Sequence, residues 1–252
     1  MAALLFVDLL GVRARWHAGG RPAAEDAFRQ FRGLVLAEAR KSPAHSQLTG
    51  AIESDAAALS CPTAVDAVDL VKRIYRTGFK VPSRQEDFRT WMRGVVVPVE
   101  EGVDLRTVTT ARNLPGIQDF AYAGPLLDAI AVERSGFKGM RVLIDDRLVD
   151  RTLKSHFEIT TKTAPLIPFK KLGHSGYPKS VAGGFQDFFW MAAACDEWGV
   201  MERQMTKRLR WSAKDSEEFV HAAATQVVFH EVLSIKHSLE NAKSRPKRRR
   251  SR

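Results

Sequence analysis

The sequence predicts an α+β protein built on one β-sheet with helices packed on one face. Short apolar runs that suit buried strands alternate with longer segments whose apolar residues recur at helical spacing. The 252 residues, 44% of them hydrophobic, suffice for one large core or two modest ones. The order of these segments, beginning strand, helix, strand, strand, helix, is that of a ferredoxin-like sheet.

The first half of the chain supplies most of this pattern. Residues 3–11, ALLFVDLLG, are apolar on both faces, as in a central strand. A helix is expected from Pro22 to about residue 42, because a proline and early acids mark its start and basic residues its end. Two short strands, 50–54 and 55–60, meet near Asp55. The remaining elements are a helix over 63–79, a strand within 89–99, a helix within 123–137 and a strand within 139–146.

The pattern changes at about residue 151. Residues 160–184 are rich in Pro, Gly and Lys and are expected to form a loop. Two long helical patterns follow, at roughly 185–208 and 213–240. The sequence therefore divides into an expected catalytic-type domain (1–150), a loop and C-terminal helical region (151–240) and a basic, disordered tail (241–252).

The net charge of +10 is concentrated in that tail. Seven of the 39 Lys and Arg residues lie in 241–252, so the rest of the chain is only about +3. Nucleic acid is thus an unlikely partner, although a tail-mediated nucleic-acid binder stays open as an alternative. No run of 18 apolar residues and no signal peptide are found, which predicts a cytoplasmic protein without a membrane segment. Cys61 and Cys195 are expected to be buried thiols.

Two acids fit their apolar surroundings poorly. Asp8 and Asp55 stand in or beside expected central strands, where an ionised carboxylate is costly unless a cation or hydrogen-bond donors compensate it. Neighbouring strands would bring the two together, and a divalent cation such as Mg²⁺ or Mn²⁺ would then relieve their repulsion. The residues alone leave open a plainer interpretation, in which Asp8 is a strand-end acid and Asp55 a turn residue.

The order and spacing of FVDLLG, IESDAAAL, RGVVV, AYAGPLLDAIAVE and MRVLID, over residues 3–148, resembles the class III nucleotide cyclases, in particular the bacterial antiphage Pycsar pyrimidine cyclases. The resemblance implies a site in which Asp8, the backbone carbonyl of Leu9 and Asp55 hold two Mn²⁺ or Mg²⁺ ions. These ions would activate the ribose 3′-hydroxyl for in-line attack on the α-phosphorus, with loss of pyrophosphate. It also implies a homodimer with the helix after Gly124 at its interface.

The departures from that family concern the base and the transition state. Ala51 and Ala121 replace the lysine and aspartate by which purine cyclases read the base, which favours a pyrimidine. The Asn and Arg that stabilise the transition state align with Leu127 and Ala131. Arg93 is the substitute candidate for the phosphate charge, a surface strand-end role being the alternative. The residues expected to contact substrate are Phe6, Thr49, Glu53 and Tyr122.

The sequence thus predicts a pyrimidine nucleotide cyclase that converts UTP, or alternatively CTP, to the 3′,5′-cyclic monophosphate. The resemblance places the product in antiphage defence, as a messenger for a separate effector. Two alternatives share the fold: an adenylate or guanylate cyclase with unusual base contacts, and a catalytically inactive cyclase-like domain that binds nucleotide.

Overall fold

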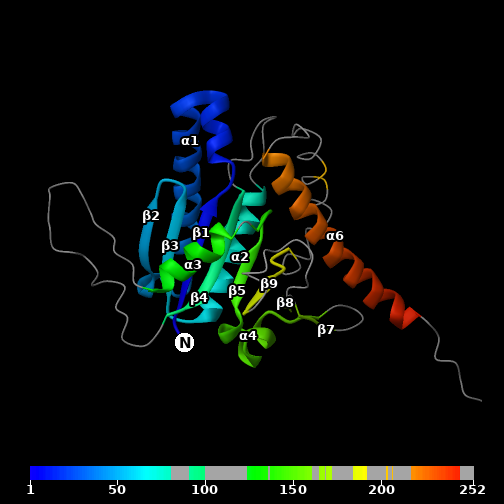
Figure 1. The fold of residues 1–252 in the computed structure, drawn as a ribbon. Helices are drawn as coiled ribbons and strands as arrows, with labels where there is room; N and C mark the ends of the chain where they lie inside the picture. The colour runs from blue at the N-terminus through cyan, green and yellow to red at the C-terminus, as the bar shows by residue number, and fades with distance from the viewer. Residues whose placement is uncertain are drawn as a thin grey trace, which may run out of the picture.

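A seven-stranded mixed sheet forms the centre of the protein in this computed structural model (Figure 1). The structure describes residues 1–80, 91–99, 124–135, 137–160, 165–167, 169–171, 184–191 and 217–244, with residues 203 and 206. The strands are β1 (Ala3–Leu9), β2 (Thr49–Glu53), β3 (Ala56–Cys61), β4 (Met92–Pro98), β5 (Val142–Asp145), β6 (Ile159–Thr160), β7 (Pro165–Leu166), β8 (Phe169–Lys171) and β9 (Phe185–Phe188). The helices are α1 (Val12–Arg40), α2 (Ala64–Lys80), α3 (Gly124–Arg134), α4 (Arg151–His156) and α6 (Glu217–Ser244), with 3₁₀ turns η1 (His45–Gln47) and η2 (Asp146–Leu148).

Strand β1 lies near the middle of the sheet, whose order is β2-β3-β1-β4-β5-β9-β8. It pairs antiparallel with β3 on one side and with β4 on the other, and β4 pairs parallel with β5. Six of its seven residues are buried, as the apolar sequence predicted for a central strand. The second sheet contains β6 and β7.

Helices cover both faces of the sheet, so the expectation of helices on one face is wrong. Side chains alternate between the two faces along a strand, and those of β1 divide accordingly. Leu5 and Val7 belong to the core that α1 and α2 cover. Leu4 and Phe6 belong to a second, smaller core that contains Ala129 of α3. Both faces of β1 are apolar, which is the sequence signal for coverage on both sides.

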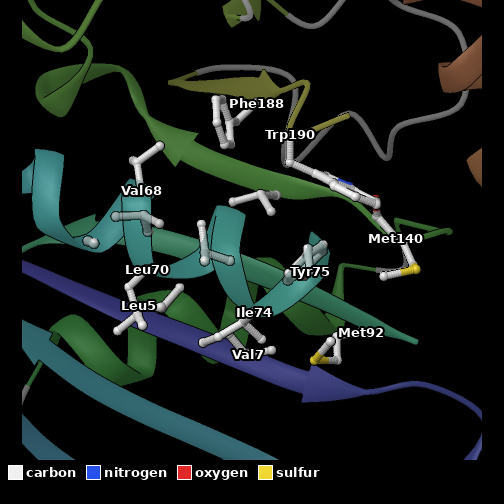
Figure 2. Packing of buried hydrophobic residues seen from close by; sticks show 14 of the residues in the cluster. Leu5, Val7, Val68, Leu70, Ile74, Tyr75, Met92, Met140, Phe188 and Trp190 are labelled. Atoms are coloured by element: carbon white, nitrogen blue, oxygen red, sulfur yellow. The ribbon is translucent and has the colours of Figure 1, made fainter. Parts of the chain in front are cut away.

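The larger core lies between α2 and the sheet. Figure 2 shows Leu70 and Ile74 of α2 facing the side chains of β1. In the part of this core near β5 and β9, the Trp190 indole N–H donates to the Met140 carbonyl at 2.8 Å. The Trp190 ring packs edge-on against Tyr75, with ring centroids 5.5 Å apart. Aromatic burial of this kind ties β5 and the segment after β9 to α2.

Helix α1 starts earlier than the sequence predicted. It begins at Val12 and is interrupted at Gly20, whose φ of 64° and ψ of −162° are not helical. The expected start at Pro22 matches the beginning of the second straight segment, where the proline is tolerated because the kink precedes it. Helix α2 follows the prediction, and the Thr63 hydroxyl oxygen accepts from the Asp66 backbone N–H at its start.

The C-terminal third contains strands that the sequence did not predict. Residues 160–184, expected as a loop, contribute to β6 and contain β7 and β8. The helix expected over 185–208 is wrong at its start, because Phe185–Phe188 form β9 between β5 and β8. Phe185, Phe188 and Phe189 recur at helical spacing, but pairing of Asp187 with Leu143 of β5 decides the conformation. The helix expected over 213–240 is found as α6, which extends to Ser244, so the expectation of disorder from residue 241 is wrong for the first four residues of the tail.

Helix α6 is anchored by two buried polar side chains. His221 Nδ1 accepts from the Gly139 backbone N–H at 3.0 Å, and Thr225 Oγ1 accepts from the Met140 N–H at 2.8 Å. Gly139 has a φ of 90°, and a β-carbon there would lie 2.9 Å from the Thr225 backbone nitrogen. The turn before β5 therefore requires glycine. Among the described helices none is long and apolar enough to span a bilayer.

Candidate functional site

Asp8 is the acid near the end of the central strand β1. It lies opposite Ala56 of β3 and opposite Arg93 of β4, so three neighbouring strands meet at this position. Its side chain follows Leu4 and Phe6 in the alternation of β1 and points to the α3 face of the sheet. Only 19% of the side chain is exposed. Asp8 is thus a half-buried carboxylate on the smaller of the two covered faces.

Asp55 lies in the tight loop that joins β2 to β3. Glu53 pairs with Ala56, so Ser54 and Asp55 alone make the turn, and Ser54 has a left-handed φ of 49°. The Asp55 backbone carbonyl accepts from the Leu9 N–H at 2.7 Å, which fastens the loop to the end of β1. Asp55 is therefore a turn residue, as the plainer interpretation held, and its turn lies beside Asp8. Whether it also binds metal stays a prediction.

Arg93 provides the positive charge beside Asp8. Its Nη2 lies 3.3 Å from Asp8 Oδ2 and also contacts Glu133 Oε1 of α3. Its Nη1 donates to the Phe137 carbonyl at 3.4 Å, and its guanidinium carbon lies 5.9 Å from the centre of the Phe137 ring. With its side chain 18% exposed, Arg93 is not the surface strand-end arginine of the alternative interpretation.

Burial dominates the electrostatics of Asp8. It raises the pKa of the carboxyl to about 6, with the nearby Asp55 charge adding to the rise and Arg93 opposing it. The single guanidinium, which Glu133 also contacts, does not offset the loss of water around Asp8. A further cation at this position would stabilise the ionised form.

A divalent cation fits the donor set at this end of β1. Asp8 and Asp55 supply hard carboxylate oxygens, as Mg²⁺ and Mn²⁺ prefer, and the raised pKa of Asp8 indicates an incompletely compensated charge. Within the described part of the chain no group of three or more His, Cys, Asp or Glu side chains could hold a metal ion. Any ion here would need water, backbone or substrate oxygens to complete its shell. The Leu9 carbonyl stays a predicted ligand.

Two of the predicted substrate residues, Glu53 and Phe6, lie in neighbouring rows on the α3 face of the sheet. The row Glu53, Ala56, Asp8, Arg93 runs over four strands, and the next row is Ala51, Ala58, Phe6, Val95. Glu53, which is exposed, thus lies two strands from Asp8, and the buried Phe6 lies two residues before Asp8 on β1.

Thr49 is placed differently. It lies opposite Ser60, which in turn lies opposite Leu4, so it is four residues along the strands from the Asp8 row, or about 13 Å. It lines a separate hollow of about 460 Å³ between α1 and β2, together with Arg32 and Arg40. Asp8 and Arg93 do not line that hollow. Thr49 is therefore not gathered with the candidate catalytic side chains.

The remaining positions singled out in the sequence add no polar group to the site within the described part of the chain. Tyr122 and Ala121 lie outside the described residues. Leu127 and Ala131 are exposed on α3, and neither carries a polar group that could stabilise charge. Cys61 is a buried free thiol as predicted, whereas Cys195 lies outside the described residues.

Sequence reasoning missed Glu133. Its side chain belongs to the buried side of α3 with Pro125 and Ala129, a spacing of four residues that places all three on one helix face. An acid on the otherwise apolar face of a helix is a signal that the sequence alone contains. Its partner Arg93, however, is 40 residues away in the chain and becomes evident only in the fold.

Comparison with solved structures finds distant structural likenesses. No family model matches the chain, and no curated protein matches it. A solved structure of an adenylate cyclase from Trypanosoma brucei, in its monomeric state, is similar with a TM-score of 0.44 and 13% sequence identity, covering 74% of this chain and 87% of that chain. A likeness at this level supports no conclusion about this chain. Its own residues show a mixed α/β protein with a half-buried carboxylate and an arginine side by side at the end of a central strand.

Proposed function

We propose that the protein is a nucleotidyl cyclase that acts on a pyrimidine nucleoside triphosphate. The observation that carries the proposal is the position of Asp8 and Asp55 at one end of β1, joined by the Leu9–Asp55 hydrogen bond, with the pKa of Asp8 raised by burial. Bound Mn²⁺ or Mg²⁺ would lower the pKa of the ribose 3′-hydroxyl and neutralise triphosphate charge. Asp8 and Asp55 would hold the ions.

Arg93 supports the same proposal from β4. Its guanidinium lies next to Asp8, where the charge of a triphosphate would be carried beside the metal ions. An arginine suits phosphate oxygens because its planar fork donates two parallel hydrogen bonds. The reaction would release pyrophosphate and close the 3′-oxygen onto the α-phosphorus.

The preference for a pyrimidine follows from what is missing near the base. Ala51 lies in the row next to Asp8 and has only a methyl group, which cannot hydrogen-bond a purine edge. Glu53, exposed in the same row as Asp8, is the described side chain best placed to meet a polar group of the base. We expect UTP to be the preferred substrate, with CTP next, and the product to serve as a messenger in antiphage defence.

The partners expected from the resemblance remain part of this proposal. The cyclases that the chain resembles work as homodimers, so we expect the metal-bearing half of one copy to face the helix after Gly124 of a second copy. A separate effector would sense the cyclic product. The proposal places the protein in the cytoplasm.

The test is a substrate panel. Purified protein is incubated with Mn²⁺ and ATP, GTP, CTP or UTP separately, and pyrophosphate and cyclic product are followed by mass spectrometry. Asp55→Asn keeps the size of the turn residue and removes its charge, and we expect it to lose at least about 100-fold in rate, since ligand loss removes the metal's contribution. Cyclic product from a purine alone would overturn the pyrimidine assignment.

A second candidate is a catalytically inactive domain that binds a nucleoside triphosphate. Exposed apolar side chains at Leu127 and Ala131, in place of polar transition-state groups, favour it. This candidate predicts Mn²⁺-dependent nucleotide binding by calorimetry without any cyclic product, at protein concentrations that span the monomer and the dimer. Product formation at any of them would exclude it.

A further inference from the structure

Arg93 is shared by two carboxylates that come from different layers of the protein. Asp8 belongs to the sheet, and Glu133 belongs to the helix that covers it. The same guanidinium nitrogen, Nη2, faces both acids. Glu133 is more buried than Asp8, with 9% of its side chain exposed against 19%. One cation therefore faces two carboxylates, and Asp55 adds a third nearby.

The contacts of Arg93 are not divided equally. The distance from Nη2 to Asp8 Oδ2, 3.3 Å, is long for a charge-assisted hydrogen bond, and the same nitrogen also contacts Glu133 Oε1. Nη1 donates to the carbonyl of Phe137, just beyond the end of α3, and the ring of Phe137 lies under the guanidinium. Three of its four contacts thus come from the α3 segment, and the contact with Asp8 is a single long one.

We infer that Glu133 is a positioning residue that holds Arg93 back from Asp8 and so keeps this carboxylate open to a divalent cation. A guanidinium binds a single carboxylate through two parallel hydrogen bonds when nothing else competes for it. Without Glu133, Arg93 would turn fully to Asp8, occupy both of its oxygens and neutralise the charge that attracts the metal. The inference rests on the proposed function only through the metal site at Asp8 and Asp55.

The test is a double-mutant cycle read by metal binding, without nucleotide or turnover. Free Mn²⁺ is measured by electron paramagnetic resonance in titrations of the wild type, Glu133→Gln, Arg93→Gln and the double variant. We expect Glu133→Gln to weaken Mn²⁺ binding about tenfold, and Arg93→Gln to bind at least as tightly as the wild type. In the Arg93→Gln background the change at Glu133 should have no further effect, because the competing guanidinium is gone.

A general effect of charge predicts a different result. If Glu133 merely adds negative potential, Glu133→Gln weakens binding equally with and without Arg93, and this outcome overturns the inference. Asp128→Asn is the matched control, because Asp128 is exposed on the same helix and its substitution removes the same charge. Glu133→Asp keeps the charge but shortens the side chain, so we expect it to weaken Mn²⁺ binding as well. If only the charge of residue 133 mattered, this variant would bind Mn²⁺ like the wild type.

The remaining outcomes separate this inference from the proposed function. Thermal unfolding monitored by circular dichroism verifies that each variant is folded, and Glu133→Asp replaces Glu133→Gln in the cycle if the latter is not. Wild-type binding that Asp55→Asn abolishes but Glu133→Gln leaves unchanged would refute the role of Glu133 and leave the metal site intact. Absence of Mn²⁺ binding in the wild type would refute both the metal site and the role of Glu133.

Discussion

The buried histidine that anchors α6 should make the fold sensitive to acid. His221 accepts from the Gly139 N–H through Nδ1, and a protonated imidazole cannot accept this bond. Burial, together with the positive charges of Lys138 and Arg93, lowers the pKa of His221 to about 4. The histidine is therefore neutral in the folded protein at pH values where it is already protonated in the unfolded chain.

The sign and size of the effect follow from these two pKa values. The folded pKa of about 4 lies below the ordinary histidine value of 6.5, so the stabilisation is complete above pH 6.5 and is lost as the pH falls toward 4. A difference of roughly 2.5 pKa units at about 1.4 kcal/mol each corresponds to about 3 kcal/mol. Since a small domain is stable by about 5–15 kcal/mol, a loss of this size is readily measured.

The assay compares the wild type with His221→Asn, whose side-chain oxygen can accept the same hydrogen bond but does not titrate. The free energy of unfolding is measured in urea with EDTA, from pH 7.5 to pH 4.5, by circular dichroism. We expect the wild type to lose about 2–3 kcal/mol more than His221→Asn over this range. Contributions from other groups, including Asp8, are common to both proteins and cancel in the difference.

Parallel pH profiles for the two proteins would refute this reasoning, because they would show that His221 does not change its proton affinity on folding. A constant offset would not, since it reports only the altered packing of the smaller side chain. His237→Asn is the control, because His237 is exposed on the same helix. We expect its profile to follow that of the wild type.

Three further perturbations test the fold and the site. Gly139→Ala should destabilise the protein by about 2–3 kcal/mol in urea unfolding, because it places a methyl group against Thr225 at a left-handed φ; unchanged stability would show that the turn can relax. Thr63→Ala should cost about 1 kcal/mol by removing the N-terminal cap of α2, and Thr63→Ser, which keeps the hydroxyl, should restore most of it. Asp8→Asn should stabilise the metal-free protein by up to about 3 kcal/mol at pH 8, because the wild-type carboxylate must ionise in a buried place there. Near pH 4 it should have little effect. The pKa of Asp8 is raised from 3.8 to about 6, so the stability profiles of the two proteins should separate between these two pH values. Added Mn²⁺ should raise the melting temperature of the wild type but not of Asp8→Asn, and equal shifts would place the metal elsewhere.

Much of the fold is determined by local patterns in the sequence. The doubly apolar run of β1, the paired strands around Asp55 and the amphipathic α2 have periodicities that a single segment contains, and all three are found where they were predicted. The unusual position of Asp8 is equally local, because a carboxylate within an apolar strand is visible without any partner.

The tertiary structure decided what depends on pairing between distant segments. Residues 185–188 have helical spacing of their aromatic side chains but form β9, because the open edge of β5 supplies backbone partners that an isolated segment lacks. The placement of α3 on the opposite face from α2 likewise depends on which side of β1 each helix buries. Local propensity is too weak to settle either choice.

The candidate site shows the same division. Asp8 and Asp55 could be named from the sequence because each conflicts with its own neighbours. Glu133 also stands out as an acid on an apolar helix face, but its role could not be named, since it depends on the guanidinium of Arg93, which only the packing of α3 on the sheet brings to it. An electrostatic interaction depends on distance in space and on burial, and both are set by the assembled fold rather than by position along the chain.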